Sequence, residues 1–338
     1  MLYILPMENQ QLTQFLLDWF AQNGRNLPWR HKGGAHPNPY AVFVSEMMLQ
    51  QTTVKTVIPY FERFMQRFPT VQDLASATDD EVAQYWQGLG YYSRARALLH
   101  TAQTVCHTYG GHFPQTETEV AKLKGFGPYM TASFLALAFN QPQTVVDGNV
   151  MRIMCRMFGL TQPLDEVLPQ IRAHATALTS TIHPADYASA IMDLGATVCT
   201  PKKPLCTLCP WQKYCISIGR TDLEQIPARR SIAKKEYDGL VFIIRNAKGQ
   251  IYIRKRTEKG LLHGLYEFPW DTTTPNWLSD ISVSENYVTH IFTHIKMKLQ
   301  IVYATSKQQP TDGLFVTPAQ LTDYPMSTLM RKVCRYLK

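Results

Sequence analysis

The hydrophobic pattern of the chain changes period once, and this change limits the possible folds more than any other feature. From about residue 8 to residue 220, apolar residues recur at the three- and four-residue spacing of amphipathic helices, as in QQLTQFLLDWFAQN and RARALLHTAQTVCHTY. Beyond residue 237 the period falls to two, in GLVFII, QIYIRKR and IKMKLQIVYA. The sequence therefore predicts a helical domain over residues 1–220 and an α+β domain over residues 237–338. In the stretch IKMKLQIVYA, one face of the strand would carry Ile295, Met297, Leu299, Ile301 and Tyr303.

The stretch between the two predicted domains is basic. Residues 201–235 hold eight lysine or arginine residues and two acidic residues, and they include PARRSIAKK. We interpret residues 221–236 as a basic linker. The net charge of +8 favours a polyanionic partner such as nucleic acid, although a lysine-rich surface also serves solubility alone.

A membrane location is not expected. No apolar run approaches the ~18 residues that a membrane-spanning helix needs. The opening MLYILPMENQ lacks the basic flank and the cleavage site of a signal peptide. We expect a cytoplasmic protein without membrane contact, and one that associates with the nucleoid if it binds DNA.

Four of the seven cysteines lie in one short loop, CTPKKPLCTLCPWQKYC, at residues 199–215. They are separated by six, two and five residues. Zinc sites usually combine two separate Cys-x2-Cys pairs, whereas this compact spacing favours a [4Fe–4S] cluster, with zinc as the alternative. A cluster here could be purely structural and stiffen a basic loop against DNA. The predicted ligands are Cys199, Cys206, Cys209 and Cys215.

A helix-hairpin-helix is predicted over about residues 116–139. Thr116 and Glu119 form a capping-box pattern at the start of the first helix, and Pro128 suits the first turn of the second. The first helix is expected to end near Lys124, and the second near residue 139.

Two glycines would form the turn of this hairpin. Without side chains, Gly125 and Gly127 would let backbone N–H groups approach a phosphate, helped by the dipole of the second helix. On the glycines alone, an ordinary glycine C-cap followed by a helix start is the simpler interpretation.

The hairpin and the segments that follow it resemble a known superfamily. VVDGNVMR and the four-cysteine loop follow the hairpin in the order found in the endonuclease III superfamily of DNA glycosylases. This resemblance implies an essential aspartate at Asp147. Superfamily members that also cut the DNA backbone carry a lysine where this chain has Tyr129, and tyrosine cannot form their Schiff base. The hairpin residues that carry the resemblance are Leu123, Gly125, Gly127, Thr131 and Ala132.

Three further motifs narrow the resemblance. LPWR (27–30), VSEMMLQQTTV (44–54) and GLGYYSRAR (88–96), together with Tyr129, are similar to the adenine DNA glycosylases of the MutY family. That family removes adenine mispaired with 8-oxoguanine or guanine in double-stranded DNA. The resemblance covers nearly the whole chain. It implies a monomeric, monofunctional DNA repair enzyme that leaves an abasic site and needs no nucleotide cofactor.

Two carboxylates fit this chemistry. Cleaving the bond to adenine calls for a proton on the base and negative charge beside an oxocarbenium-like sugar. Glu46 lies within the apolar stretch AVFVSEMML, where burial would keep it protonated as the general acid. Asp147 precedes GNVMRIM at an N-cap position, which favours its charged form beside the sugar cation, although a capping role alone is also possible. The resemblance adds Tyr129 and Asn149, which we expect to position Asp147 and the water.

The resemblance also implies a set of DNA contacts. Because a paired base cannot be reached inside a duplex, the enzyme must flip adenine out and fill the gap. Gln51 and Tyr91 match the family residues that insert around the lesion. The whole predicted DNA-binding set is Arg30, Gln51, Thr52, Leu89, Tyr91, Gly125 and Gly127.

The C-terminal domain resembles the MutT-like, Nudix-fold domain with which this family reads 8-oxoguanine. The Gly-x5-Glu-x7-Arg-Glu-x-x-Glu-Glu box that a Nudix hydrolase needs is not found in the sequence. Phe292, Thr293 and His294 stand at the start of a predicted strand, where the family has Phe-Ser-His. Because Thr293 keeps the hydroxyl donor and acceptor, we expect recognition of 8-oxoguanine to be retained.

Two other functions stay open at this point. A bifunctional glycosylase with lyase activity on another lesion is disfavoured by Tyr129, which replaces the expected lysine. A non-catalytic iron–sulfur regulator that binds DNA and senses redox state is disfavoured by the pairing of Glu46 with Asp147.

Overall fold

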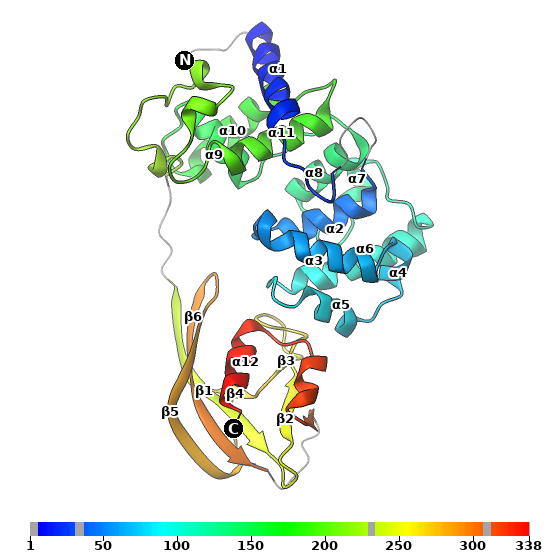
Figure 1. The fold of residues 1–338 in the computed structure, drawn as a ribbon, viewed down its shortest axis with the longest axis vertical. Helices are drawn as coiled ribbons and strands as arrows, with labels where there is room; N and C mark the ends of the chain where they lie inside the picture. The colour runs from blue at the N-terminus through cyan, green and yellow to red at the C-terminus, as the bar shows by residue number, and fades with distance from the viewer. Residues whose placement is uncertain (1–5, 31–36, 229–233, 307–311, 338) are drawn as a thin grey trace. The chain divides into compact units, whose positions relative to one another are not determined.

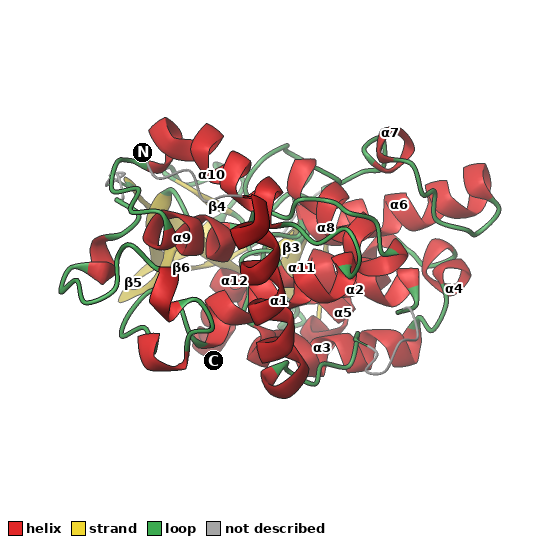
Figure 2. Cartoon of the chain, turned by 90° about the horizontal axis from the view of Figure 1, so that it is seen from above, coloured by secondary structure: helices red, strands yellow, loops and turns green. Residues whose placement is uncertain are grey.

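The computed structural model describes residues 6–30, 37–228, 234–306 and 312–337 of the 338-residue chain. Contacts divide the chain into two compact units, residues 1–75 with 100–230 and residues 76–99 with 231–338. Helices form the first unit and strands dominate the second, as Figures 1 and 2 show. The domain boundaries at residues 220 and 236 stay a prediction, and residues 229–233 of the predicted linker lie outside the described residues.

The helices of the first unit follow the apolar periodicity of the sequence. α6 belongs to this unit from His100 onward. The elements are α1 (Pro6–Asn23), α2 (Pro39–Leu49), α3 (Val54–Arg67), α4 (Val71–Ala75), α6 (Ser93–Tyr109), α7 (Glu117–Val120), α8 (Pro128–Phe139), α9 (Gly148–Met157), α10 (Leu164–Leu178), α11 (Pro184–Thr197), η1 (Cys206–Leu208), η2 (Gln212–Tyr214) and η3 (Leu223–Gln225).

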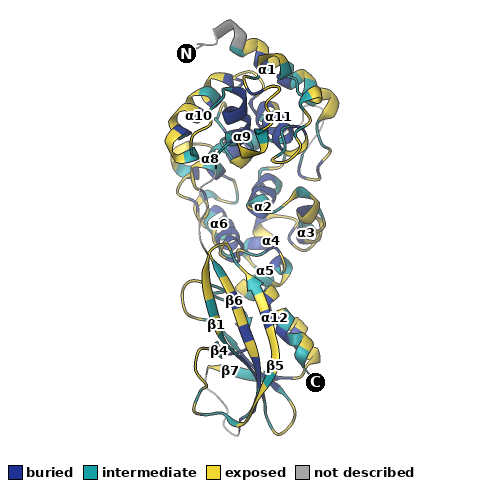
Figure 3. Cartoon of the chain, turned by 90° about the vertical axis from the view of Figure 1, so that its left-hand side faces the viewer, coloured by how far each residue is buried: buried dark blue, intermediate teal, exposed yellow. Residues whose placement is uncertain are grey.

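Two central helices, α2 and α8, are buried on almost all sides (Figure 3). Aromatic rings join them: Phe43 of α2 stacks on Phe126 at 5.6 Å between ring centroids, and Phe134 of α8 meets Phe126 edge-on at 5.3 Å. Such a helix normally carries no charge, because an unpaired charge is costly in an apolar core. Glu46 is nevertheless on α2, with only 4% of its surface exposed.

The hairpin differs from its prediction in one helix. Thr116 does cap the first helix, since its Oγ1 accepts the N–H of Glu119 at 3.3 Å. However, α7 ends at Val120, so the expectation that this helix reaches Lys124 is wrong. Residues 121–125 form successive turns instead, and Gly125 has a φ of 87°, a left-handed conformation that favours glycine. The second helix begins at Pro128 and ends at Phe139, as expected.

The second unit is built on a mixed sheet. Its strand order is β3-β2-β1-β6-β5, with β4 paired to β1 and β7 paired to β2. β1 and β6 run parallel, and β5 and β6 run antiparallel. The unit also contains the first part of α6. Its other elements are α5 (Asp79–Trp86), β1 (Lys235–Arg245), β2 (Ile251–Lys255), β3 (Tyr266–Glu267), β4 (Trp270–Asp271), β5 (Ser279–Ile291), β6 (Ile295–Thr305), β7 (Gly313–Val316), η4 (Ala319–Asp323), α12 (Thr328–Val333) and η5 (Cys334–Tyr336).

One face of β6 packs against α12, which confirms the predicted alternation. Met297, Leu299 and Ile301 are buried in the same core as Leu329 and Met330 of α12, with Ile295 and Tyr303 partly buried beside them. The expected α+β architecture is therefore confirmed. β5 had not been predicted, because most of its residues are polar and exposed and its pairing with β6 is interrupted by two irregularities (Figure 3).

Candidate active site

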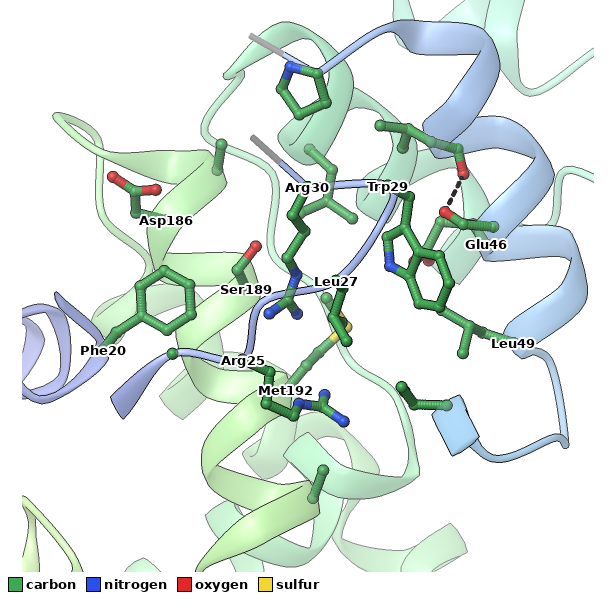
Figure 4. Close-up of a pocket in the computed structure, with 18 of the residues that line it drawn as sticks. Phe20, Arg25, Leu27, Trp29, Arg30, Glu46, Leu49, Asp186, Ser189 and Met192 are labelled. Atoms are coloured by element: carbon green, nitrogen blue, oxygen red, sulfur yellow. Dashed lines mark hydrogen bonds between the residues drawn. The ribbon is translucent and has the colours of Figure 1, made fainter. Parts of the chain in front are cut away.

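The four residues predicted to be catalytic line one cavity of the first unit, and Figure 4 labels Glu46 among the side chains around it. Its volume is about 1130 Å³. Glu46 comes from α2, Tyr129 from α8, and Asp147 and Asn149 from the start of α9. Parts of the chain that are about 100 residues apart in sequence therefore meet at one surface. Among the described residues, no helix is both long enough and apolar enough to span a membrane.

Glu46 is held in a setting that favours its protonated form. Burial raises the pKa of Glu46 and outweighs the hydrogen bonds from Ser133 and Tyr129 and the positive charge of Arg30, which lower it. Ser133 Oγ donates to Glu46 Oε2 at 2.6 Å, and Tyr129 Oη donates to the same oxygen at 3.0 Å. Because two donors occupy Oε2, the proton of a neutral Glu46 belongs on Oε1.

Ser133 was missed by the sequence analysis. It is fully buried and lies one helical turn after Tyr129 on α8, so both hydroxyls reach the same carboxyl oxygen. The i, i+4 spacing of Tyr129 and Ser133 on an otherwise apolar helix was the available signal.

Replacing Ser133 should move the pH dependence of the reaction in a defined direction. A hydrogen bond to the charged form of Glu46 lowers its pKa, so Ser133→Ala should raise that pKa further. The active form of a general acid is the protonated one, and the reaction slows as the pH rises through its pKa. We therefore expect the alkaline limb of the single-turnover rate profile to move to higher pH. An unchanged limb, or one at lower pH, would contradict this role for Ser133.

Asp147 caps α9 and also faces the cavity. Its Oδ1 accepts the N–H of Val150 at 2.7 Å, and its Oδ2 accepts Asn149 Nδ2 at 2.8 Å. The positive end of the α9 dipole stabilises a negative charge at this position. Its charge in turn raises the pKa of Glu46. The two carboxyl groups are thus in opposite environments, one buried and one at a helix N-terminus.

Asn149 is fixed by two further contacts. Its Oδ1 accepts Arg152 Nη2 at 2.8 Å, which orients the amide so that Nδ2 points to Asp147. Gly195 of α11 leaves the room that Asn149 needs, since a Cβ at position 195 would lie 2.5 Å from the Asn149 Cβ. The predicted positioning role of Asn149 is compatible with this geometry.

Two of the predicted DNA-inserting residues have an unusual backbone. Gln51 and Tyr91 are exposed, and both adopt positive φ angles, 57° and 49°. This conformation costs free energy for residues other than glycine and is concentrated at functional sites. Thr52, next to Gln51, is half-buried, whereas Gly125 and Gly127 are exposed at the hairpin turn.

Two other residues of the predicted DNA-binding set are placed differently. Leu89 is only 6% exposed, so its side chain is buried rather than presented at the surface. The Arg30 guanidinium donates two 2.9 Å hydrogen bonds to the buried carboxylate of Asp193. A residue that contacts a phosphate is expected to point its guanidinium outward, whereas that of Arg30 is paired inside the protein. The predicted DNA contact of Arg30 therefore stays a prediction.

The predicted reader of 8-oxoguanine forms the turn between β5 and β6. Phe292 is partly buried against the core and meets His290 edge-on at 4.5 Å, while Thr293 and His294 are exposed. Within the same unit, the hydroxyls of Thr293 and Tyr91 are 2.6 Å apart. The Thr293 hydroxyl, which could contact a base, therefore has a hydrogen-bond partner at an exposed turn.

The four clustered cysteines lie near enough for their charges to act on one another, although no three His, Cys, Asp or Glu side chains of the described residues form a site for a single metal ion. Burial raises the pKa values of Cys206, Cys209 and Cys215, and Cys199 raises each of them further because the sulfur atoms lie near one another. The Arg156 guanidinium lies 3.6 Å from Cys199 Sγ. Four neighbouring sulfur ligands beside a buried cation suit a negatively charged metal–thiolate group, so the residues present fit an iron–sulfur cluster.

Comparison with known families agrees with this arrangement. Residues 44–174 match the HhH-GPD superfamily of base excision DNA repair proteins. Residues 199–215 match the iron–sulfur binding domain of endonuclease III. Residues 240–336 match the NUDIX domain. The predicted glycosylase fold, the iron–sulfur loop and the Nudix-fold domain are thereby confirmed.

Similar whole proteins decide the family. Adenine DNA glycosylase from Mus musculus is 35% identical over an alignment that covers 95% of this chain and 76% of the mouse protein. The Homo sapiens protein of the same name is 34% identical, covering 98% of this chain and 76% of the human protein. The chain belongs to the adenine DNA glycosylase family.

Membership of the adenine DNA glycosylase family confirms that the protein is a base excision repair N-glycosylase, an enzyme that binds DNA and carries an iron–sulfur group. A solved thermostable thymine-DNA glycosylase covers 62% of this chain and 95% of its own, with 27% identity and a TM-score of 0.55. A solved endonuclease III–DNA complex covers 64% of this chain and 97% of its own, with 18% identity and a TM-score of 0.53. The latter likeness concerns the fold alone.

Proposed function

We propose that the protein excises adenine mispaired with 8-oxoguanine or guanine in duplex DNA and leaves an abasic site. The observation that carries this proposal is the pair of carboxyl groups in one cavity, with Glu46 buried and Asp147 at a helix N-terminus. Such a pair separates the two tasks of the reaction, because one group keeps its proton and the other keeps its charge.

Glu46 delivers the proton. In the proposed reaction, Glu46 Oε1 protonates N7 of the flipped adenine, and the electron pair of the N-glycosidic bond leaves with the base. The resulting Glu46 carboxylate then accepts a proton from a water molecule, while the oxygen of that water attacks C1′ of the sugar. Ser133 and Tyr129 hold the other carboxyl oxygen in both steps.

Asp147 stabilises the sugar. Its carboxylate faces the positive charge that develops as the bond to adenine breaks, and Asn149 together with the Val150 N–H fixes its orientation. Because these two hydrogen bonds to Asp147 are present before substrate binds, its carboxylate needs little reorganisation during the reaction.

The enzyme is proposed to be monofunctional. Tyr129 offers no amine, and burial raises its pKa well above the usual range, so it remains a neutral donor. Among the described residues that line the cavity, Lys55 is the one lysine, and borohydride trapping would reveal its use as a nucleophile.

DNA would be held by the hairpin and read by the C-terminal unit. Around Gly127, the site of a Cβ atom has no protein neighbour within 4 Å, which leaves open space beside the N-terminus of α8 for a phosphate. The turn of Phe292, Thr293 and His294 would contact 8-oxoguanine. We further propose that the enzyme works as a monomer in the cytoplasm, on the DNA of the nucleoid.

Single-turnover release of adenine tests the proposal. The substrate is a duplex with one adenine opposite 8-oxoguanine, and strand breaks are scored before and after alkali. We expect base release, with breaks mainly after alkali. Immediate breaks together with borohydride trapping would show a lyase, and a lack of release with the cluster intact would reject the proposed activity.

The cluster is proposed to be of the [4Fe–4S] type, held by Cys199, Cys206, Cys209 and Cys215. When bound, it would link four points of one loop and hold that loop against α9, to which the end of the loop is joined by the backbone hydrogen bond from the Ile216 N–H to the Met157 carbonyl at 3.0 Å. No step of the reaction passes through it.

Removing one ligand should cost the protein its iron. Cys209→Ser should remove most of the iron and the broad visible absorption, and it should lower the melting temperature, because structural metal binding contributes free energy to folding. The matched change Cys106→Ser, in α6 and outside the loop, should leave the iron content, the visible absorption and the melting temperature unchanged. Zinc in place of iron would show that the alternative metal is the correct one.

A further inference from the structure

A buried ion pair forms part of the cavity wall. Asp193 of α11 is fully buried and accepts five hydrogen bonds from two arginines of the segment that connects α1 to α2. Arg25 contributes its backbone N–H at 2.9 Å, Nε at 2.9 Å and Nη2 at 2.6 Å. Arg30 contributes Nη1 and Nη2, both at 2.9 Å. One carboxylate thus fixes two points of the segment that are five residues apart.

The charges of this cluster do not cancel locally. Burial alone would raise the pKa of Asp193, but Arg30 and Arg25 outweigh it, so the carboxyl is ionised. Two positive charges therefore share one negative charge inside the protein. Arg30 also lowers the pKa of Glu46, and Arg25, Arg30 and Glu46 line the same cavity (Figure 4).

The groups that act on Glu46 come from three other parts of the fold. They are Ser133 and Tyr129 on α8, Asp147 before α9, and Arg30 on the connecting segment. Arg30 is the one cation among them, and it favours loss of the Glu46 proton. Other charged or titratable side chains that line the cavity, and that stay the same in every variant below, are Asp18, Arg25, Lys55, His183 and Asp186.

We propose that Asp193 is a positioning residue of the reaction, which holds Arg30 against α11 and offsets part of its positive charge so that Glu46 keeps the proton it delivers to adenine. The inference rests on the proposed function. It also accounts for a costly feature, since burying a carboxylate with two guanidinium groups is seldom favoured for stability alone.

The pH dependence of single-turnover adenine release tests the inference. Asp193→Asn keeps the shape of the side chain and removes its charge, so Arg30 acts on Glu46 uncompensated. A nearby charge typically shifts a pKa by about one unit or more. We expect the alkaline limb of the rate profile to move to lower pH by about one unit, with a rate about tenfold lower on that limb. The double change Asp193→Asn with Arg30→Gln should return the limb to its original position or above it.

Two further variants keep the test decisive. Asp323→Asn makes the same chemical change at an exposed site outside the cavity and should leave the profile in place. Arg30→Gln alone should move the alkaline limb to higher pH. This variant tests the inference if melting curves show that Asp193→Asn does not fold.

The outcomes separate the two proposals. An Asp193→Asn profile that is lowered equally at every pH would show a structural role only and overturn the inference. An Arg30→Gln limb that stays in place would do the same. Failure of the unaltered protein to release adenine at any pH would instead reject the proposed function, and the inference with it.

Discussion

Glu46→Gln should lower the rate of adenine release on the order of 10³-fold, the contribution expected of a positioned general acid. Glutamine retains an oxygen that can accept from Ser133 and Tyr129, so the packing of α2 should be preserved. What it lacks is an acidic proton for the leaving base. Binding of the mispaired duplex, measured by fluorescence anisotropy, should therefore be nearly unchanged while release is lost.

A matched control is available on the surface. Glu62→Gln makes the same change on an exposed face of α3 and should leave both binding and release intact. If Glu46→Gln still released adenine within tenfold of the normal rate, Glu46 would not be the acid, and the role of its raised pKa would have to be sought elsewhere.

Asp147→Asn should lower the rate by about 10²–10³-fold, the range found when one preorganised electrostatic partner of a transition state is removed. Asparagine caps helices about as well as aspartate, so the bond to the Val150 N–H and the stability of α9 should be retained. The change also removes a negative charge that raises the pKa of Glu46. The alkaline limb of the residual activity should therefore move to lower pH.

A second substitution separates capping from catalysis. Asp147→Ala removes both the charge and the cap, and it should cost about 1 kcal/mol of stability in addition to the rate. Melting temperature and single-turnover rate, measured on both variants, distinguish the two roles. Normal release by Asp147→Asn would leave Asp147 as a helix cap only.

Much of the fold could be predicted because local signals determined it. Pro128 marked the first residue of α8, and Asp147 marked the N-cap of α9. The first helix of the hairpin was predicted too long, since apolar and polar residues alone do not show that the chain turns after Val120. β5 was missed although Ile281, Val283, Tyr287 and Ile291 alternate along it, because polar residues surround these four and they are exposed rather than packed in a core.

The sequence by itself determined the family, and it predicted the four cysteine ligands and the roles of Glu46 and Asp147, because these depend on residue type and spacing. It also predicted that Glu46 keeps its proton, but it could not show which partners control that proton. The hydroxyl donors of Glu46 lie 83 and 87 residues away along the chain, and the Asp193 carboxylate is 163 residues from Arg30. A pKa depends on burial and on charges near in space. Only the packing of α2, α8 and α11 around one cavity decided which hydroxyls reach Glu46 and which arginines Asp193 pairs with.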